Sequence, residues 1–205
     1  MLGLLPPGTF TTLLGNMEKV SEPNREKLAQ LEQKNDWRGI ADFAGENLQR
    51  DPQNAEWWIV RGFAFTQLGE YQPAIDSFQE AVRFEPSEMT GWHLLAETQR
   101  AAKQPDRAAR TLESALRVSQ DSATTWYLLG VAYYDAGNFE RAAQAYTSAL
   151  TRDSRNTNAW YGLAVSNFRL GRKQETDAAL AGLRRLDPQL ADQVATAMRN
   201  QPAPR

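Results

Sequence analysis

Tryptophan recurs at a constant spacing in this chain, and this constrains the fold more than any other feature. An interval of 34 residues separates Trp58, Trp92, Trp126 and Trp160. Four residues after each Trp comes a small residue, namely Gly62, Ala96, Gly130 or Ala164. Twenty residues after each Trp comes a bulky apolar residue, namely Phe78, Leu112, Tyr146 or Leu180. A fixed period of this length is the signature of a protein built from stacked structural repeats.

Each repeat is predicted to contain two helices. In the unit 123–156, apolar residues at helical spacing predict a first helix from about Thr124 to Asp135. Gly137 and Asn138 then supply a glycine cap and a turn residue. A second helix is predicted from about Phe139 to Thr151. Antiparallel helices approach closely only where side chains are small, so each small residue after a Trp should face the bulky residue of the second helix.

Together these positions resemble the tetratricopeptide repeat (TPR) family. The resemblance rests on the periodic Trp, the Gly or Ala four residues later, an aromatic at Phe65 and Tyr133, an Ala near the start of most second helices, and Pro86 or Pro188 at a unit end. It extends over residues 55–188. It implies an all-α fold, a right-handed superhelical solenoid of antiparallel helix pairs. The first helix of each pair would then line a concave wall.

The period divides the chain into seven segments. Residues 1–20 are an apolar N-terminal segment, and residues 21–54 are a degenerate TPR unit that lacks the Trp. Further units are predicted at residues 55–88, 89–122, 123–156 and 157–188. Residues 189–205 hold a C-terminal capping helix and a short tail. This last helix is predicted over about 188–199, with Asp187 as its N-cap and Pro188 as its first residue.

The chain offers few groups that could carry out chemistry. It has no Cys and a single His, which excludes a His-rich metal site and a Cys–His catalytic pair. No phosphate-binding glycine motif is present, and the carboxylates are scattered over predicted turns and exposed helix faces. We therefore predict no catalytic residue, no metal and no cofactor, and a protein that is not an enzyme. A net charge of −2 also argues against a nucleic-acid partner.

The predicted concave wall is the candidate binding site. Its proposed peptide-binding residues are Phe63, His93, Glu97, Arg100, Tyr127, Val131, Tyr134, Asn158, Tyr161 and Arg169. The three tyrosines lie off the helix stripe that packs within a repeat, and aromatic anchors with few charges are typical of a protein-binding groove. Two alternatives remain open. His93 could be only a polar lining residue, and the wall could be covered by a tight superhelix or by the chain's own terminus.

One known TPR subtype is not expected. Co-chaperone TPR domains clamp a C-terminal carboxylate with Lys, Arg and Asn side chains on the concave wall. The corresponding positions here hold Ile59, Phe63, Leu94, Thr124 and Leu128. On the basis of this resemblance, the acidic tails of the major cytosolic chaperones are not expected to be ligands.

The N-terminal segment is apolar and carries no charged side chain before Glu18. Its apolar side chains include Leu2, Leu4, Leu5, Phe10, Leu13, Leu14 and Met17. We expect it to pack on a repeat surface, either its own groove or that of a neighbouring molecule in a homo-oligomer; the alternative is a disordered leader remnant. It is broken by Pro6, Pro7 and Gly8, and no stretch of about 20 apolar residues predicts a membrane span.

The predicted function is a non-enzymatic scaffold or adaptor that binds a segment of a partner protein in an apolar and aromatic groove. The alternatives are a self-associating assembly factor of a larger complex and a regulatory subunit of an enzyme. The sequence shows no export signal, so a cytoplasmic location is predicted, with the periplasm as the alternative. The partner and its pathway stay open at this point.

Overall fold

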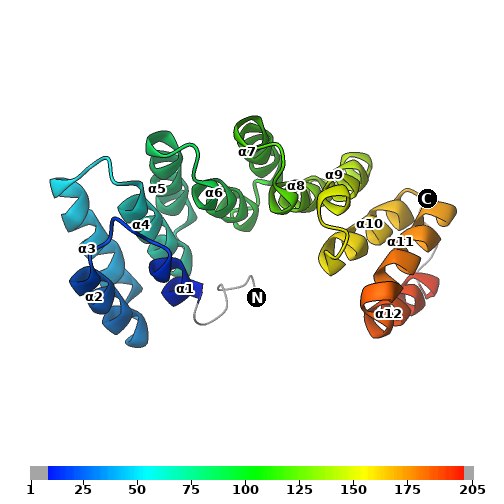
Figure 1. Cartoon of the computed structure of the whole chain (residues 1–205), viewed down its shortest axis with the longest axis horizontal. Helices are drawn as coiled ribbons and strands as arrows, with labels where there is room; N and C mark the ends of the chain where they lie inside the picture. The colour runs from blue at the N-terminus through cyan, green and yellow to red at the C-terminus, as the bar shows by residue number, and fades with distance from the viewer. Residues whose placement is uncertain (1–8, 201–205) are drawn as a thin grey trace. The chain divides into compact units, whose positions relative to one another are not determined.

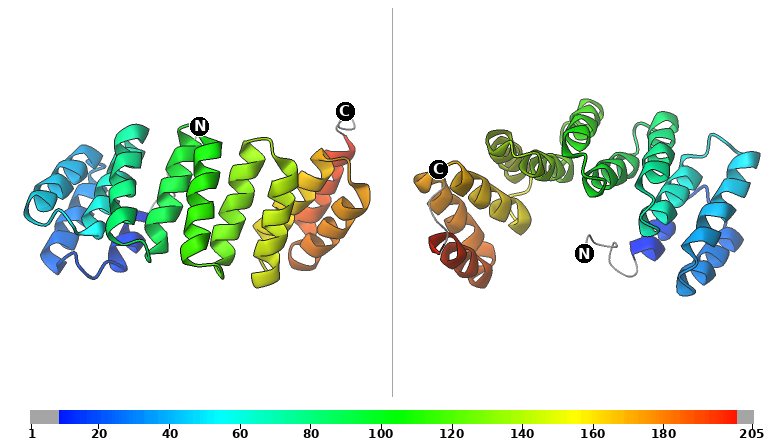
Figure 2. Two further views of the ribbon diagram at one scale, coloured as in Figure 1. Left: turned by 90° about the horizontal axis from the view of Figure 1, so that it is seen from above. Right: turned by 180° about the vertical axis from the view of Figure 1, so that it is seen from behind.

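A computed structural model describes residues 9–200 of the chain, and every regular element in that range is an α-helix. The helices are grouped in two compact units, Met1–Gln104 and Pro105–Arg205. Within each unit, helices that follow one another in the sequence pack side by side as antiparallel pairs (Figures 1 and 2). The predicted all-α fold of paired helices is thereby confirmed. None of the helices between residues 9 and 200 combines the length and the hydropathy needed to cross a membrane.

The first unit contains six of the helices in the described range. They are α1 (Thr9–Gly15), α2 (Glu22–Gln33), α3 (Trp37–Arg50), α4 (Ala55–Gln67), α5 (Tyr71–Phe84) and α6 (Met89–Ala101). The second unit contains the other six. They are α7 (Pro105–Val118), α8 (Ala123–Asp135), α9 (Phe139–Arg152), α10 (Thr157–Arg169), α11 (Lys173–Leu186) and α12 (Pro188–Arg199).

The helix boundaries predicted from the sequence agree closely with the structure in the second unit. Helices α8 and α9 lie within one residue of their expected ends, and α12 spans Pro188–Arg199 as expected. The carboxylate of Asp187 caps α12 by accepting a hydrogen bond from the backbone N–H of Leu190 at 2.9 Å. Helix α2 begins at Glu22, and Pro23 is tolerated in its first turn.

The turn inside each helix pair has the same backbone conformation in five successive repeats. Asn35, Gly69, Lys103, Gly137 and Gly171 all have positive φ angles, between 52° and 77°. The residue after each donates its N–H to the carbonyl oxygen five positions earlier, as Asn138 does to Tyr133 at 2.8 Å. This is the hydrogen-bond pattern of the Schellman motif, in which glycine is preferred. Lys103 adopts the conformation without the freedom of glycine, because the repeat geometry requires it.

The predicted contact between small and bulky residues is present in the structure. A Cβ atom added to Gly62 would lie 2.7 Å from the ring of Phe78, and one added to Gly130 would lie 2.7 Å from the ring of Tyr146. Tyr146 also lies against Gly162 of α10, which belongs to the next repeat. One aromatic ring therefore packs on two glycines, and it joins neighbouring repeats as well as the two helices of its own.

The periodic tryptophans have a role that the sequence analysis did not find. Each indole N–H donates a hydrogen bond to the backbone carbonyl oxygen six residues earlier, in the connection that precedes its helix. The donor–acceptor distances are 2.9 Å for Trp58, 2.8 Å for Trp92, 3.1 Å for Trp126 and 2.9 Å for Trp160. A Phe or a Leu could fill the same space but could not form this bond. The spacing of the Trp residues therefore reflects a hydrogen bond as well as packing.

Candidate functional site

The segment after residue 8 packs on the repeats of its own unit. Phe10 of α1 is 1% exposed and Leu14 is 4% exposed. The ring centroid of Phe10 lies 5.0 Å from that of Phe63 in α4 and 5.7 Å from that of Trp37 at the start of α3. Trp37 and Phe63 are themselves 6.0 Å apart. Rings from three helices thus form one aromatic cluster, and its distances are those of favourable ring–ring contacts.

A carboxylate in the first turn of α4 fixes the chain that follows α1. The two carboxylate oxygens of Glu56 accept hydrogen bonds from the backbone N–H groups of Glu18 at 2.8 Å, Lys19 at 2.7 Å and Val20 at 2.9 Å. The ammonium group of Lys19 also forms an ion pair with Glu85. Hydrogen bonds to a charged acceptor are stronger than neutral ones, so Glu56 holds three consecutive residues between α1 and α2.

We call the surface that receives this segment the docking face. It consists of Glu32, Trp37, Glu56 and Phe63. Glu32 contributes through its carboxylate, which accepts a hydrogen bond from the hydroxyl of Thr11 at 2.6 Å. The docking face therefore combines two aromatic rings with two carboxylates, and it binds an apolar helical turn followed by non-helical backbone.

The occupied docking face changes the interpretation of two predictions. The expectation that the apolar N-terminal segment packs on its own repeats is confirmed for residues 9–20, while Leu2, Leu4 and Leu5 lie outside the described residues. Phe63 was predicted to contact a partner polypeptide, and in this structure the chain's own N-terminal segment occupies that contact. Its side chain is 1% exposed, because the ring of Phe10 lies on it.

The remaining candidate residues of the first unit lie on α6. They are His93, Glu97 and Arg100, and all three are half-buried. Helices α4 and α6 are neighbours, since the hydroxyl oxygens of Thr66 and Thr98 are 3.3 Å apart. The first helices of these two adjacent repeats therefore lie side by side within this unit.

Burial shifts the pKa values of two of these α6 side chains in opposite directions. Burial lowers the pKa of His93, and the nearby negative charge of Glu88 only partly opposes this. Burial raises the pKa of Glu97, and the positive charge of Arg100 partly opposes that. In both cases the loss of water disfavours the charged form. His93 and Glu97 are four residues apart on one helix face, so this face presents polar groups that favour their neutral states.

The candidate residues of the second unit form two aromatic contacts. The ring centroid of Tyr127 lies 6.0 Å from that of Tyr146, and the centroid of Tyr134 lies 5.2 Å from that of Phe139. The guanidinium of Arg169 lies 4.6 Å from the centroid of the same Phe139 ring. Tyr134 of α8 and Arg169 of α10 are therefore brought together by Phe139 at the start of α9.

The description of the tyrosines as lying off the packing stripe is wrong in part. Tyr127, Val131 and Tyr134 are half-buried and pack against the core cluster formed by buried residues of α9 and α10. Tyr161 is 44% exposed, and Asn158 and Arg169 are also exposed. The exposed part of the predicted wall in this unit is thus on α10.

Two residues of the candidate site were missed by the sequence analysis, and they occupy the same position of the repeat. Trp37 and Phe139 are each the first residue of a second helix, three periods apart, and Tyr71 is at the same position. Trp37 contacts the docked Phe10, and Phe139 joins Tyr134 to Arg169. An aromatic residue directly after the turn was the signal that could have identified both.

In the described part of the chain, no three His, Cys, Asp or Glu side chains come together in a group that could hold a metal ion. The candidate site consists of aromatic rings, hydrogen-bonding side chains and the docked segment. Surfaces of this kind recognise polypeptides through buried aromatic anchors and a few well-placed polar groups.

Stacked helix pairs with an aromatic-lined face define the class of helical repeat proteins that act as protein-interaction scaffolds. A family model described as the TPR domain of cytochrome c-type biogenesis protein H matches residues 44–152. A general tetratricopeptide repeat model matches residues 127–191. The chain belongs to the tetratricopeptide repeat family. No curated protein sequence matches it.

Solved structures of other TPR proteins are similar to this fold. MamA from Desulfovibrio magneticus RS-1 is 19% identical, with a TM-score of 0.70 over 84% of this chain and 97% of that one. YrrB, described as a TPR protein with an unusual peptide-binding site, is 16% identical, with a TM-score of 0.69 over 94% and 98%. TTC0263 of Thermus thermophilus is 21% identical, with a TM-score of 0.59 over 85% and 96%. Identities this low establish the shared fold alone.

Proposed function

We propose that this protein is a non-catalytic scaffold that binds a segment of a partner polypeptide, and that the docking face is one of its binding surfaces. The observation that carries this proposal is the docked segment itself. Residues 9–20 place an aromatic side chain against Trp37 and Phe63 and present three backbone N–H groups to Glu56. A partner segment with the same chemistry could make the same contacts.

The docked segment indicates what such a partner would look like. It would carry a Phe or a similar aromatic residue in a short helix, followed within a few more residues by non-helical backbone with free N–H groups. An aromatic side chain buries roughly 150–250 Å² of surface. At about 25 cal/mol per Å² of apolar area, this burial supplies several kcal/mol before the cost of ordering the segment. Glu56 would then set the register of the bound chain.

A second contact surface is proposed on the other unit. Tyr161, Asn158 and Arg169 are exposed on α10, and the half-buried Tyr127, Val131 and Tyr134 on α8 support them. The half-buried His93, Glu97 and Arg100 on α6 are proposed as the polar contacts of the first unit. Tyrosine and arginine are both favourable anchors in protein interfaces, and α10 exposes one of each.

A role as an assembly factor is the second candidate. The match to the TPR domain of cytochrome c-type biogenesis protein H favours it, because that protein is named for the biogenesis of c-type cytochromes. The same match supports the periplasm, the alternative location, over the cytoplasm. In this case the bound segment would belong to a component of the assembly pathway.

The docking face is tested with a labelled peptide of residues 1–20 and the full-length chain. We expect the peptide to bind the Phe10→Ala chain at least about tenfold more tightly than the native chain, because the variant's own segment competes less well. Adding Phe63→Ala to this variant should abolish binding. An Asn16→Ala peptide is the matched control and should bind as the native peptide does, whereas a Phe10→Ala peptide should not. Equal binding to the Phe10→Ala chain with and without Phe63→Ala would refute the assignment.

A further inference from the structure

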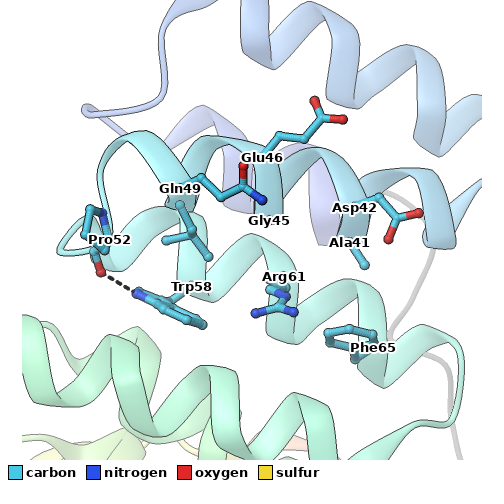
Figure 3. A pocket seen from close by; sticks show the side chains of 10 residues that line it. Ala41, Asp42, Gly45, Glu46, Gln49, Pro52, Trp58, Arg61 and Phe65 are labelled. Atoms are coloured by element: carbon cyan, nitrogen blue, oxygen red, sulfur yellow. Dashed lines mark hydrogen bonds between the residues drawn. The ribbon is translucent and has the colours of Figure 1, made fainter.

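A pocket with a volume of about 580 Å³ lies between α3 and α4 in the first unit (Figure 3). Helix α4 lines it with Trp58, Arg61 and Phe65, and α3 lines it with small residues such as Ala41 and Gly45. The docking face is elsewhere: Phe63 and Arg61 are two residues apart on α4, and residues at this spacing do not face the same side of a helix. The pocket is therefore a separate site.

A guanidinium lies between two aromatic rings in this pocket. The central carbon of the Arg61 guanidinium is 5.7 Å from the ring centroid of Trp58 and 5.4 Å from that of Phe65. Its Nε atom is buried and has no hydrogen-bond partner. Within residues 9–200 the guanidinium forms cation–π contacts and no ion pair or hydrogen bond. A buried donor without a partner costs free energy, and this calls for an explanation other than packing.

The repeat pattern shows that the fold does not require an arginine here. The residue three positions after the periodic Trp is Leu95, Leu129 or Leu163 in the other three repeats. Leu95 and Leu129 are 4% and 3% exposed, so this is a core position. The equivalent pocket in the second unit is lined by α9, α10 and α11, with Trp160 and Leu163 at the matching positions and a volume of about 540 Å³. Among the four repeats that carry the periodic Trp, Arg61 thus replaces a packing leucine in one only.

The charges around Arg61 indicate the ligand class. Asp42 and Glu46 of α3 also line the pocket, and Figure 3 shows both carboxylates directed away from the guanidinium. They leave Arg61 without a counterion but make the surroundings negative. A doubly charged anion is disfavoured by such surroundings, whereas a singly charged carboxylate can accept two parallel hydrogen bonds from the guanidinium. The flanking rings exclude water and strengthen that pairing.

We propose that the Arg61 pocket binds the carboxylate of an acidic side chain in a partner polypeptide that lies along the groove between α3 and α4. The guanidinium would be the charged donor, and Trp58 and Phe65 would cover the aliphatic part of the Asp or Glu side chain. A volume of this size is within the range of ligand-binding pockets and exceeds what one carboxylate needs, so neighbouring residues of the partner would share it.

The proposal is tested by NMR on the full-length chain, with the Nε–H signal of Arg61 and the indole N–H signal of Trp58 as reporters. Arg61→Lys assigns the first signal by its loss. The probe is N-acetyl-glutamate amide, and N-acetyl-glutamine amide is the uncharged control. We expect both reporters to shift saturably with the glutamate probe, with a millimolar Kd, and not with the glutamine probe. The absence of a saturable shift at probe concentrations up to about 50 mM, well above such a Kd, would overturn the proposal.

Two further measurements separate the competing explanations. Titration with inorganic phosphate should move the Arg61 signal at least about fivefold less effectively than the glutamate probe, and stronger binding of phosphate would overturn the carboxylate assignment. Arg61→Leu introduces the residue of the other repeats. We expect this variant to melt no lower than the native chain and to lose the Trp58 response. A fall in melting temperature of more than about 5 °C would instead assign Arg61 to packing and refute the proposal.

Discussion

The ring of Tyr146 lies directly on Gly130, at a position where a Cβ atom would come within 2.7 Å of the ring. Tyr146 is 3% exposed and also contacts Gly162, so its ring has little room to move away. We therefore expect Gly130→Ala to lower the free energy of unfolding by about 1–3 kcal/mol, as overpacked core substitutions do. Urea denaturation followed by circular dichroism measures this.

Gly45→Ala is the matched control for that substitution. Gly45 is also inside a helix, but a Cβ atom added to it would meet nothing within 4 Å. Alanine is favoured over glycine in a helix, so this variant should gain about 0.5–1 kcal/mol. If both variants changed stability in the same direction, the contact between Gly130 and Tyr146 would not be the cause.

Lys103 is expected to strain the turn between α6 and α7. Its φ angle is 62°, whereas Gly137 has 77° at the corresponding position of the next repeat. Lys103→Gly should raise the free energy of unfolding by about 1 kcal/mol, because glycine adopts this conformation without steric cost. Gly137→Ala should lower it by a similar amount. An unchanged or lower midpoint of urea denaturation for Lys103→Gly would show that the turn is not strained.

His93 should make stability depend on pH. Its pKa is lowered in the folded state from 6.5, mainly by burial, so the unfolded chain binds the proton more readily. This contribution destabilises the fold as pH falls through 6.5 and is absent well above that value. Thermal melts of the native chain and His93→Gln between about pH 5 and 8 should diverge on the acidic side, with the variant losing less stability. If the two chains kept a constant difference in melting temperature over this range, the burial of His93 would not perturb its ionisation.

Glu97 contributes to the same pH profile with the opposite sign. Its pKa is raised from 4.5, mainly by burial, so the folded chain holds the proton more readily and stability falls as pH rises through that region. Glu97→Gln should therefore remove a loss of stability that the native chain shows above pH 4.5. Melts of both chains in acidic and neutral buffers measure this, and parallel profiles would contradict it.

Glu56 should control how firmly the N-terminal segment is held. Its carboxylate accepts hydrogen bonds from three backbone N–H groups. A side-chain amide at this position would carry no charge and would offer only one acceptor oxygen. Glu56→Gln should raise the hydrogen-exchange rates of the Glu18, Lys19 and Val20 amides by about tenfold, equivalent to about 1.4 kcal/mol. Glu26→Gln, on the exposed face of α2, is the control and should leave these rates unchanged.

Replacing Trp126 by Phe should show the value of the indole hydrogen bond. The variant keeps an aromatic ring but removes the indole donor that lies 3.1 Å from the carbonyl oxygen of Gln120, which keeps a second donor, the Nε–H of Arg152, at 3.1 Å. We expect a loss of about 1 kcal/mol beyond the small change in buried area. Trp37→Phe is the control, because the contacts of Trp37 within the described residues are ring contacts. Equal losses for the two variants would show that the hydrogen bond is not important.

The periodic part of the molecule could be predicted because each position is repeated along the chain. The pairing of Gly62 with Phe78 and of Gly130 with Tyr146 was predicted from the positions four and twenty residues after each Trp, and the structure confirms it. The same logic located the turns. Even Lys103, which stands where other repeats have glycine, adopts the positive φ angle found at this position of the repeat.

The contacts of the docking face could not be predicted, since the segment that occupies it occurs once. Phe10 and Phe63 are far apart in the sequence, and no period links them. The burial of Tyr127 and Tyr134 was missed for a different reason. Their rings reach Tyr146 and Phe139 on the second helix, and the helical spacing within α8 alone did not indicate these contacts. Arg61 could have been noticed in the sequence, because leucine stands three residues after each of the other periodic Trp residues.

The hydrogen bond from each periodic Trp has a consequence for how such an array can change in length. The acceptors are the backbone carbonyls of Pro52, Pro86, Gln120 and Ser154, so a proline, a glutamine or a serine can each supply the acceptor oxygen. The bond therefore depends on the six-residue spacing and not on the side chain of the acceptor. Gene duplication or loss of a whole 34-residue period would preserve every such bond without compensating substitutions. A single-residue insertion between the acceptor and its Trp would break one at once.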